Sequence, residues 1–191
     1  MNISMFDILG PIMIGPSSSH TAGAQRIGKA MYNMIADKQL QAVHFILHGS
    51  FHLTLRGHGT DRALVGGVLG MNAYDPQLKN SLEIAKERGI EVTFEGADLG
   101  DVHPNTVRII AQTTDGTLTT LTGSSVGGGE IEIVDINGTP AKFSGRYPGW
   151  SSTTSTGWAS LATSPRFWPS TRSTSSPSST PATAPAKRLS P

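Results

Sequence analysis

The sequence predicts a domain of class α/β (α+β) over residues 1–148, with a mixed sheet and flanking helices. Two observations predict this class. Apolar residues recur at helical spacing after two polar loops, and short runs rich in β-branched residues lie between and after these segments. Glycine-containing turns separate the later runs, and a length of about 145 residues is enough to enclose a normal core.

The helical segments dominate the first half of this domain. Helices are expected over residues 21–37, 63–69 and 81–88, and a shorter apolar segment over 5–9 with Ser4 as its cap. Gly66 and Gly67 interrupt the second helix, and adjacent glycines indicate close packing against a neighbouring backbone. Asn80 is the expected cap of the third helix, which should end at Gly89.

The strands lie mostly in the second half of the domain. They are expected over residues 42–47, 90–94, 106–112, 117–122, 130–136 and 140–143. Asp115-Gly116 and Asn137-Gly138 are typical of hairpin turns. His103-Pro104-Asn105 is most simply a turn before a strand. Gly127-Gly128-Gly129 matches no nucleotide-binding fingerprint and is expected to be a tight turn or a backbone contact.

Composition excludes several classes of protein. The chain has no Cys, so it forms no disulfide and cannot by itself hold a thiolate-ligated zinc ion or an iron–sulfur cluster. A net charge of +1 gives no case for binding nucleic acid or acidic lipid. The start lacks the pattern of a secretion signal and no stretch is apolar enough to span a membrane, so a cytoplasmic protein is expected.

Residues 149–191 differ in composition from the rest. They contain 20 Ser or Thr and 6 Pro in 43 positions, and no Asp, Glu, Val or Ile. Such a segment buries too little apolar area to offset the entropy of ordering it, so an unstructured tail is expected. Its four charges are all basic, which leaves residues 1–148 with 11 basic and 14 acidic residues, a net charge of −3.

The first polar loop carries a run of side chains that can hold an anion. Gly15-Pro16-Ser17-Ser18-Ser19-His20-Thr21 stands just before the first long helix. The free N–H groups at a helix start attract a carboxylate or phosphate, and Ser or Thr hydroxyls can bind the same anion. Capping of the helix by one hydroxyl explains the same pattern, although three consecutive serines exceed what a cap needs.

The second polar loop holds a histidine between two glycines. Gly57-His58-Gly59-Thr60-Asp61 lets a ligand approach the imidazole, which can take up a proton near neutral pH. The alternative is that Thr60 or Asp61 caps the helix and that His58 is a solvated turn residue. Two histidines at helix starts within one small domain favour the functional interpretation.

Another group of histidines recurs every four residues, at His44, His48 and His52. On one helix this spacing would form a metal-binding face. The residues up to Leu47 favour a strand, and Gly49-Ser50 favours a break in the chain. The three side chains therefore need not share a face, and no metal site is expected in this chain.

Together these segments resemble the β subunit, or β domain, of the iron–sulfur-dependent L-serine dehydratases, from about Met5 to Pro148. The matching segments are residues 4–23 with the serine run, 57–64 with Gly-His-Gly-Thr-Asp, 103–107 with His-Pro-Asn, and 124–131 with the three glycines. Several matches in this order are much more specific than any single one.

The resemblance implies a fold, an activity and a partner. The fold would be similar to the allosteric substrate-binding domain of some phosphoglycerate dehydrogenases. The activity would be that of an L-serine ammonia-lyase, which converts L-serine to pyruvate and ammonia in serine catabolism and gluconeogenesis. A [4Fe–4S] cluster would be held by cysteines of a partner α subunit in a hetero-oligomer, in agreement with the missing cysteines of this chain.

The family pattern also gives the site residues their expected roles. Elimination needs a base for the Cα proton and a Lewis acid for the departing hydroxyl. His58 is the expected proton-transfer residue and His20 the second catalytic histidine, and the sequence does not decide which of them is the base. The expected contacts to the substrate are Ser17, Ser18, Ser19, Thr21, Thr60 and Asp61.

Two alternatives stay open at this point. In relatives with a complete β subunit, an apolar stretch after Pro148 leads into an ACT-type regulatory domain. The Ser/Thr/Pro-rich tail that replaces it here is expected to be a frameshifted or truncated form of that domain, with an authentic linker as the alternative. The other function in question is a non-catalytic effector-binding regulatory module. A pure anion sensor would use Arg or Lys rather than an accessible His, which favours the enzyme subunit.

Overall fold

The computed structural model describes residues 12–35 and 37–144. The apolar segment expected over 5–9 and the tail expected over 149–191 lie outside the described residues. The helical elements are η1 (Ser18–Gly23, a π-helical turn), α2 (Ala24–Ile35), α3 (Gly49–Leu53), α4 (Thr60–Val68), η2 (Pro76–Asn80, a 3₁₀ helix) and α5 (Ser81–Glu87). The strands are β1 (Leu40–Leu47), β2 (Glu91–Gly96), β3 (Thr106–Thr113), β4 (Leu118–Gly127), β5 (Glu130–Ile136) and β6 (Thr139–Ser144).

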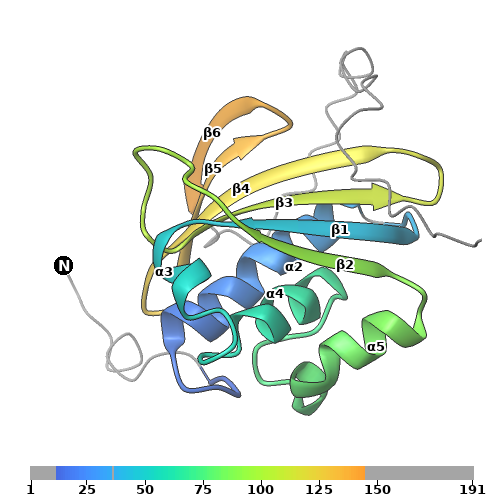
Figure 1. The fold of residues 1–191 in the computed structure, drawn as a ribbon, viewed down its shortest axis with the longest axis horizontal. Coiled ribbons are helices and arrows are strands. Elements are labelled where there is room, and N and C mark those ends of the chain that lie inside the picture. Colours follow the sequence, from blue (N-terminus) through green and yellow to red (C-terminus); the bar gives the residue numbers. More distant parts are fainter. Residues whose placement is uncertain (1–11, 36, 145–191) are drawn as a thin grey trace, which may run out of the picture. The chain divides into compact units, whose positions relative to one another are not determined.

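The strands form one six-stranded sheet with the order β2-β1-β3-β4-β5-β6. β1 and β2 run parallel, and every other neighbouring pair is antiparallel. The parallel pair requires a crossover, which α3, α4 and α5 provide between the two strands. The mixed sheet with flanking helices is therefore confirmed, and Figure 1 shows the helices gathered on one face of the sheet.

The core lies between that face and the helices. Alternate residues of the neighbouring strands β1 and β3 point into it and are buried, namely Val43, Phe45 and Leu47 of β1 and Val107, Ile109 and Ala111 of β3. From the helices, Ile27 and Met31 of α2 and Leu64 of α4 pack against them and are fully buried. The period of two in the strands and of three to four in the helices places one apolar face of each element on the same core.

Two glycines let α2 and α4 cross with their backbones in contact. A Cβ added to Gly67 would meet the Gln25 carbonyl oxygen and the Gly28 Cα, and one added to Gly28 would meet the Leu64 carbonyl oxygen. Main-chain atoms cannot move aside as a flexible side chain can, so neither position has room for a side chain. The close backbone packing predicted from the adjacent glycines is confirmed.

The predicted turns are also confirmed. Asn137 and Gly138 have positive φ angles of 51° and 79° and join β5 to β6. At the β3–β4 turn, the Asp115 carboxylate accepts hydrogen bonds from the Thr113 hydroxyl and the Thr117 N–H and pairs with Lys38. The hydrogen bond from Thr113, followed by the contact with Lys38, lowers the pKa of Asp115. Gly127–Gly129 form the turn between β4 and β5, with positive φ at all three residues.

The structure corrects several element boundaries. β4 continues to Gly127 rather than ending at 122, because Ser124 pairs with Thr106 and the Ser125 N–H bonds to the Asn105 carbonyl. Small polar residues have low strand propensity, which hid this half of the strand. The helix expected over 63–69 is α4 and begins earlier, at Thr60, while α2 ends at Ile35.

Helix α3 was absent from the sequence prediction, where Gly49-Ser50 indicated only a break. Gly49 does have a positive φ of 52°, but it begins a short helix rather than a loop. The Ser50 N–H donates to the Pro104 carbonyl, and Phe51 is fully buried. Tertiary contacts therefore fix a helix that is too short to be recognised from periodicity.

Candidate functional site

The site lies where η1 and the loop before α4 meet. His20 is in the π-helical turn and is only 8% exposed. His58 is in the loop that ends at Gly59, which is the N-cap of α4 and has a positive φ of 68°. The centroids of the two imidazole rings are 4.9 Å apart, with an angle of 79° between the ring planes. The structure thus brings together two histidines that are 38 positions apart in the chain.

Serine hydroxyls surround the His20 ring. Nδ1 lies 3.1 Å from the Ser19 hydroxyl and 3.3 Å from the Ser17 hydroxyl, and Nε2 lies 3.0 Å from the Ser50 hydroxyl. The Phe51 ring contacts the imidazole edge-on, with the centroids 5.4 Å apart. Because a hydroxyl can donate or accept, these three serines can support either neutral tautomer of His20.

The surroundings of His20 disfavour its charged form. Burial lowers its pKa from the ordinary value of 6.5, and the neighbouring His58 lowers it further. At neutral pH His20 is therefore a neutral imidazole, and a proton held by His58 works against a second proton on His20. Such a pair carries at most one positive charge near neutral pH.

His58 is held through its backbone rather than through its ring. The Thr21 hydroxyl donates to the His58 carbonyl at 3.3 Å, and the His58 N–H donates to the Thr54 carbonyl at 3.1 Å. Nδ1 of the imidazole is buried and has no hydrogen-bond partner within the described part of the chain. The loop thus fixes the position of His58, and its buried Nδ1 is a polar atom that the described residues leave unsatisfied.

The serine run caps its own turn, as one of the two interpretations predicted. The Ser17 hydroxyl accepts the His20 N–H at 3.2 Å, so Ser17 is the N-cap of η1. Ser17 and Ser19 also contact the His20 ring, whereas the Ser18 side chain makes no hydrogen bond to the described residues. Capping of the turn thus accounts for Ser17 alone. Ser19 instead contacts the His20 ring.

The capping interpretation of the second loop is wrong. Gly59 occupies the N-cap position of α4, and no side chain caps the helix. Thr60 is fully buried and its hydroxyl has no partner among the described residues, while the Asp61 carboxylate accepts the N–H of the adjacent Arg62 at 2.8 Å. The first turn of α4 is instead held by the Leu55 carbonyl, which accepts from the Thr60 N–H at 3.0 Å.

Sequence reasoning missed Ser50, which binds Nε2 of His20. It lies in α3, and its only signal was its place next to a glycine. It also missed a pair of buried polar atoms, Oδ1 of Asn105 and Oγ of Ser125, neither of which has a partner in the described ranges. Ser125 packs directly on Gly23 of η1, so this pair lies close to the turn that carries His20.

A small pocket of about 220 Å³ adjoins His58. Its walls include Thr21 and the loop from Arg56 to Gly59, and three basic side chains line it, namely Arg56, Arg62 and Lys79. Sequence reasoning did not identify these three. Arg56 and Arg62 flank the Gly57–Asp61 loop, which was the available signal, whereas nothing in the sequence connects Lys79 to it.

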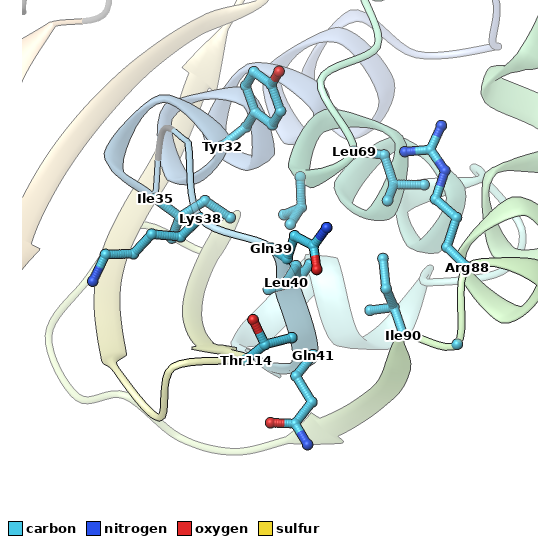
Figure 2. A pocket seen from close by; sticks show the side chains of 12 residues that line it. Tyr32, Ile35, Lys38, Gln39, Leu40, Gln41, Leu69, Arg88, Ile90 and Thr114 are labelled. Carbon is cyan, nitrogen blue, oxygen red and sulfur yellow. The ribbon is translucent and has the colours of Figure 1, made fainter.

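A larger pocket of about 520 Å³ lies near the carboxyl ends of α2 and α4 (Figure 2). Its lining is mainly apolar or uncharged, with Tyr32, Ile35, Leu40, Leu69 and Ile90 among its residues. Two basic residues, Lys38 and Arg88, also line it, and Figure 2 shows the Lys38 side chain extending away from the centre. None of the lining residues is a histidine or an acid.

The three histidines spaced by four residues do not converge. His44 in β1 bonds to Thr93 and Glu95 of β2, and His48 accepts the Leu99 N–H. His52 is exposed in α3. In the part of the chain that the structure describes, no group of three or more His, Asp or Glu is placed to hold a metal ion.

Comparison with known proteins supplies the family. Residues 4–87 match the family described as "Serine dehydratase beta chain". This segment of the chain is similar to that family. The segment includes both histidine loops and all six of the expected substrate contacts. The resemblance to the β part of the L-serine dehydratases is thus confirmed.

The relatives extend the similarity beyond the family segment. The chain is 48% identical over 145 residues to "L-serine dehydratase, beta chain" of Peptoniphilus asaccharolyticus, and 45% identical over 145 residues to "Probable L-serine dehydratase, beta chain" of Bacillus subtilis. These matches take in 75% and 76% of this chain and 65% of each relative, so the chain spans just under two thirds of their length. It is also 33% identical to "L-serine dehydratase TdcG" of Escherichia coli, over 68% of this chain and 33% of that protein.

No helix within residues 12–35 and 37–144 combines the length and the apolar character needed to cross a membrane.

Proposed function

We propose that this chain is the β subunit of an L-serine dehydratase, which eliminates water from L-serine to yield pyruvate and ammonia together with a cytoplasmic α partner. The observation that carries the proposal is the contact between His20 and His58. Their ring centroids are 4.9 Å apart, and both residues lie inside the segment that matches the family. The relatives named beta chains support the need for a partner. The E. coli protein also supports the need for a partner, because this chain matches only 33% of its length.

The chemistry needs a base for the Cα proton and an acid for the hydroxyl that leaves Cβ. The first product, 2-aminoacrylate, tautomerises to an imine, which water hydrolyses to pyruvate and ammonia. This chain can supply the base. It has no Cys and does not fit a [4Fe–4S] cluster, so we assign the cluster to cysteines of the α subunit, where it would polarise the hydroxyl.

We assign proton transfer to His58. Both ring nitrogens of His20 already contact serine hydroxyls, whereas His58 lines the pocket of about 220 Å³. The lowered pKa of His20 keeps that ring neutral, so a proton taken from substrate would stay on His58. His20 is the second histidine of the pair, which Ser17, Ser19 and Ser50 orient.

The remaining polar residues are candidates for holding the substrate. Ser17, Ser18, Ser19 and Thr21 lie in or beside the turn that carries His20, and each hydroxyl can accept or donate a further hydrogen bond. Thr60 and Asp61 stay candidate contacts at the start of α4. In this proposal residues 1–148 form the β-type domain, and residues 149–191 are a frameshifted or truncated form of an ACT-type domain.

Reconstitution tests the proposal. The purified chain should be colourless, bind no iron and form no pyruvate from L-serine, because it has no thiolate ligand. Anaerobic mixing with a cluster-loaded α subunit of the family should produce pyruvate and ammonia in equal amounts. Pyruvate formation by the chain alone would contradict the assignment of the cluster to a partner, and an inactive but stable complex would contradict the catalytic role.

A further inference from the structure

We infer that the main chain of Pro104 and Asn105 positions His20 for the proposed reaction. It acts through Ser50 at the His20 ring and through Ser125 at the end of the turn that carries this ring. The inference rests on the proposed function, which assigns no role to the His-Pro-Asn and Ser-Ser segments of the resemblance. Among the described residues, neither serine lines the pocket of about 220 Å³. Both are therefore positioning residues, which act through His20 and not by touching the substrate.

Pro104 fixes α3 against the His20 ring. Its carbonyl accepts the Ser50 N–H at 2.9 Å, and Gly49 lies so close that an added Cβ would be 2.7 Å from the same oxygen. The Ser50 hydroxyl lies 3.0 Å from Nε2 of His20. Because the main-chain contact leaves Ser50 little freedom, the hydroxyl holds the imidazole at a defined place.

Ser50 differs from the other hydroxyls that contact the His20 ring. Ser17 and Ser19 lie beside or within η1, the turn that carries His20, so they move together with the ring. Among the described residues, Ser50 is the hydroxyl partner of the ring that belongs to another element, α3. It therefore ties the ring to the rest of the domain, which the serines of the turn cannot do.

Asn105 fixes β4 against the same turn. Its carbonyl accepts the Ser125 N–H at 2.9 Å, and Ser125 is fully buried. The Ser125 side chain packs on the main chain of Gly23, the last residue of η1, where an added Cβ would be 2.7 Å from the Ser125 Cβ. Two consecutive carbonyls thus hold two separate supports of one turn.

The turn depends on such supports because it is π-helical. Turns of this kind are rare and occur frequently at functional sites. η1 has six residues, so its own hydrogen bonds give it little stability. The His20 ring meets the His58 ring edge-on, so a shift of the turn would change the surroundings of the base in the proposed reaction. A displacement of about 1 Å at an active site can cost about 10²-fold in rate.

The NMR signals of His20 in the full 191-residue chain test this positioning without any α subunit, so its failure is distinguishable from a failure of the proposed function. Ser50→Ala removes the partner of Nε2 and should change the tautomer ratio, which the chemical shifts of the ring nitrogens report. Ser50→Thr keeps the hydroxyl and should keep the original signals. Thr113→Val is the control, since it removes a buried hydroxyl at the β3–β4 turn and should lower stability without changing the His20 signals.

A compensating pair of substitutions tests the contact with β4. Gly23→Ala places a Cβ against Ser125 and should shift the His20 signals, whereas Gly23→Ala combined with Ser125→Gly makes room for this Cβ and should restore them. In the reconstituted enzyme, Ser50→Ala and Gly23→Ala should each lower kcat at least about tenfold and change KM less than about threefold. Ser50→Thr and the double variant should stay within about threefold of the original kcat.

Three results would overturn the inference. They are unchanged His20 signals in both Ser50→Ala and Gly23→Ala, an equal change of these signals in Thr113→Val, or an active reconstituted enzyme whose kcat neither substitution lowers. If the original chain forms no active complex, the proposed function fails, and the His20 signals alone decide whether Ser50 and Ser125 position the ring.

Discussion

The two pockets of this domain both carry basic side chains, and they differ in how those charges are balanced. Near the carboxyl ends of α2 and α4, Lys38 lies 2.9 Å from Asp115 and 2.8 Å from the Thr117 hydroxyl, which leaves Arg88 as a single charge (Figure 2). Beside His58, three cations stand without an acidic partner in the described ranges. In the described ranges, the lining of the larger pocket thus has one basic side chain without an ion pair, and that of the smaller pocket has three.

This difference shows that pocket size alone is a poor guide to function here. The pocket of about 520 Å³ has more room, but its polar groups are either exposed to solvent or satisfied by neighbours. The smaller pocket is lined by His58, whose buried Nδ1 has no hydrogen-bond partner among the described residues. A buried polar atom without a partner costs stability, so the protein tolerates a cost at His58 that the larger pocket does not show.

The largest expected effect is a loss of activity on substitution of His58, which lines the smaller pocket. His58→Gln keeps a hydrogen-bonding side chain of similar size but cannot take up a proton near neutral pH, so kcat of the reconstituted enzyme should fall by about 10² to 10⁴. Arg88→Gln in the larger pocket should leave kcat within about twofold. Steady-state kinetics after confirming assembly of the complex measure both.

Two other results would change this assignment. Near-normal kcat in His58→Gln together with a large loss in His20→Gln would transfer the role of base to His20. Near-normal kcat in both variants would mean that this chain binds and does no chemistry.

The next largest expected effect is a loss of stability at the crossing of α2 and α4. Gly67→Ala places a Cβ against backbone atoms of α2, and overpacking of this kind costs about 1–3 kcal/mol, so the melting temperature should fall by about 3–10 °C. Gly57→Ala is the matched control, because its Cβ would meet only the Thr54 carbonyl at 3.8 Å. Its melting temperature should stay within about 2 °C of the original. An unchanged midpoint in Gly67→Ala would show that the crossing can relax.

A smaller effect should appear in the dependence of stability on pH. The pKa of His20 is lowered in the folded chain by burial and by His58, so below about pH 6.5 the unfolded chain takes up a proton more readily than the folded one. The stability that neutral His20 provides is complete above this pH and declines as pH falls. His20→Gln should therefore lose less melting temperature between pH 7.5 and pH 5.5 than the original chain. His103→Gln, at an exposed histidine, should keep the original loss.

The smallest expected effect on stability is at Lys38, in the lining of the larger pocket. Lys38→Gln removes a half-exposed ion pair with Asp115, and pairs of this kind contribute little in water. Its melting temperature should stay within about 2 °C of the original. A large loss would mean that the β3–β4 turn depends on this charge more than its exposure suggests.

The fold was predictable wherever a pattern repeated over many residues. The spacing in α2 and the β-branched residues of β1 and β3 led to correct elements, and Gly66-Gly67 led to the correct backbone contact. Sequence patterns did not predict elements that are fixed by tertiary contacts rather than by local propensity. Helix α3 depends on the burial of Phe51 and on a hydrogen bond to Pro104, and the second half of β4 on the pairing of Ser124 with Thr106.

The site was predictable to the level of its loops. The sequence indicated that His20 and His58 belong to two special helix starts, and the structure brings the rings together. It could not indicate Ser50, which is 30 positions from His20 in the chain, or Lys79, which joins the two arginines only through the packing of η2 on α4. Such contacts depend on three-dimensional register, which no local spacing encodes.

The contact between Gly28 and Gly67 also offers a criterion for sorting homologous sequences. α2 follows directly on the turn that carries His20, and α4 begins two residues after His58, so the approach of these two helices fixes how far apart the imidazoles lie. A homologue with side chains at both glycine positions would have to separate the helices, and its two histidines would no longer be within 5 Å of each other. Glycine at both positions should therefore accompany both histidines from sequence to sequence, and chains that have lost one pair should have lost the other.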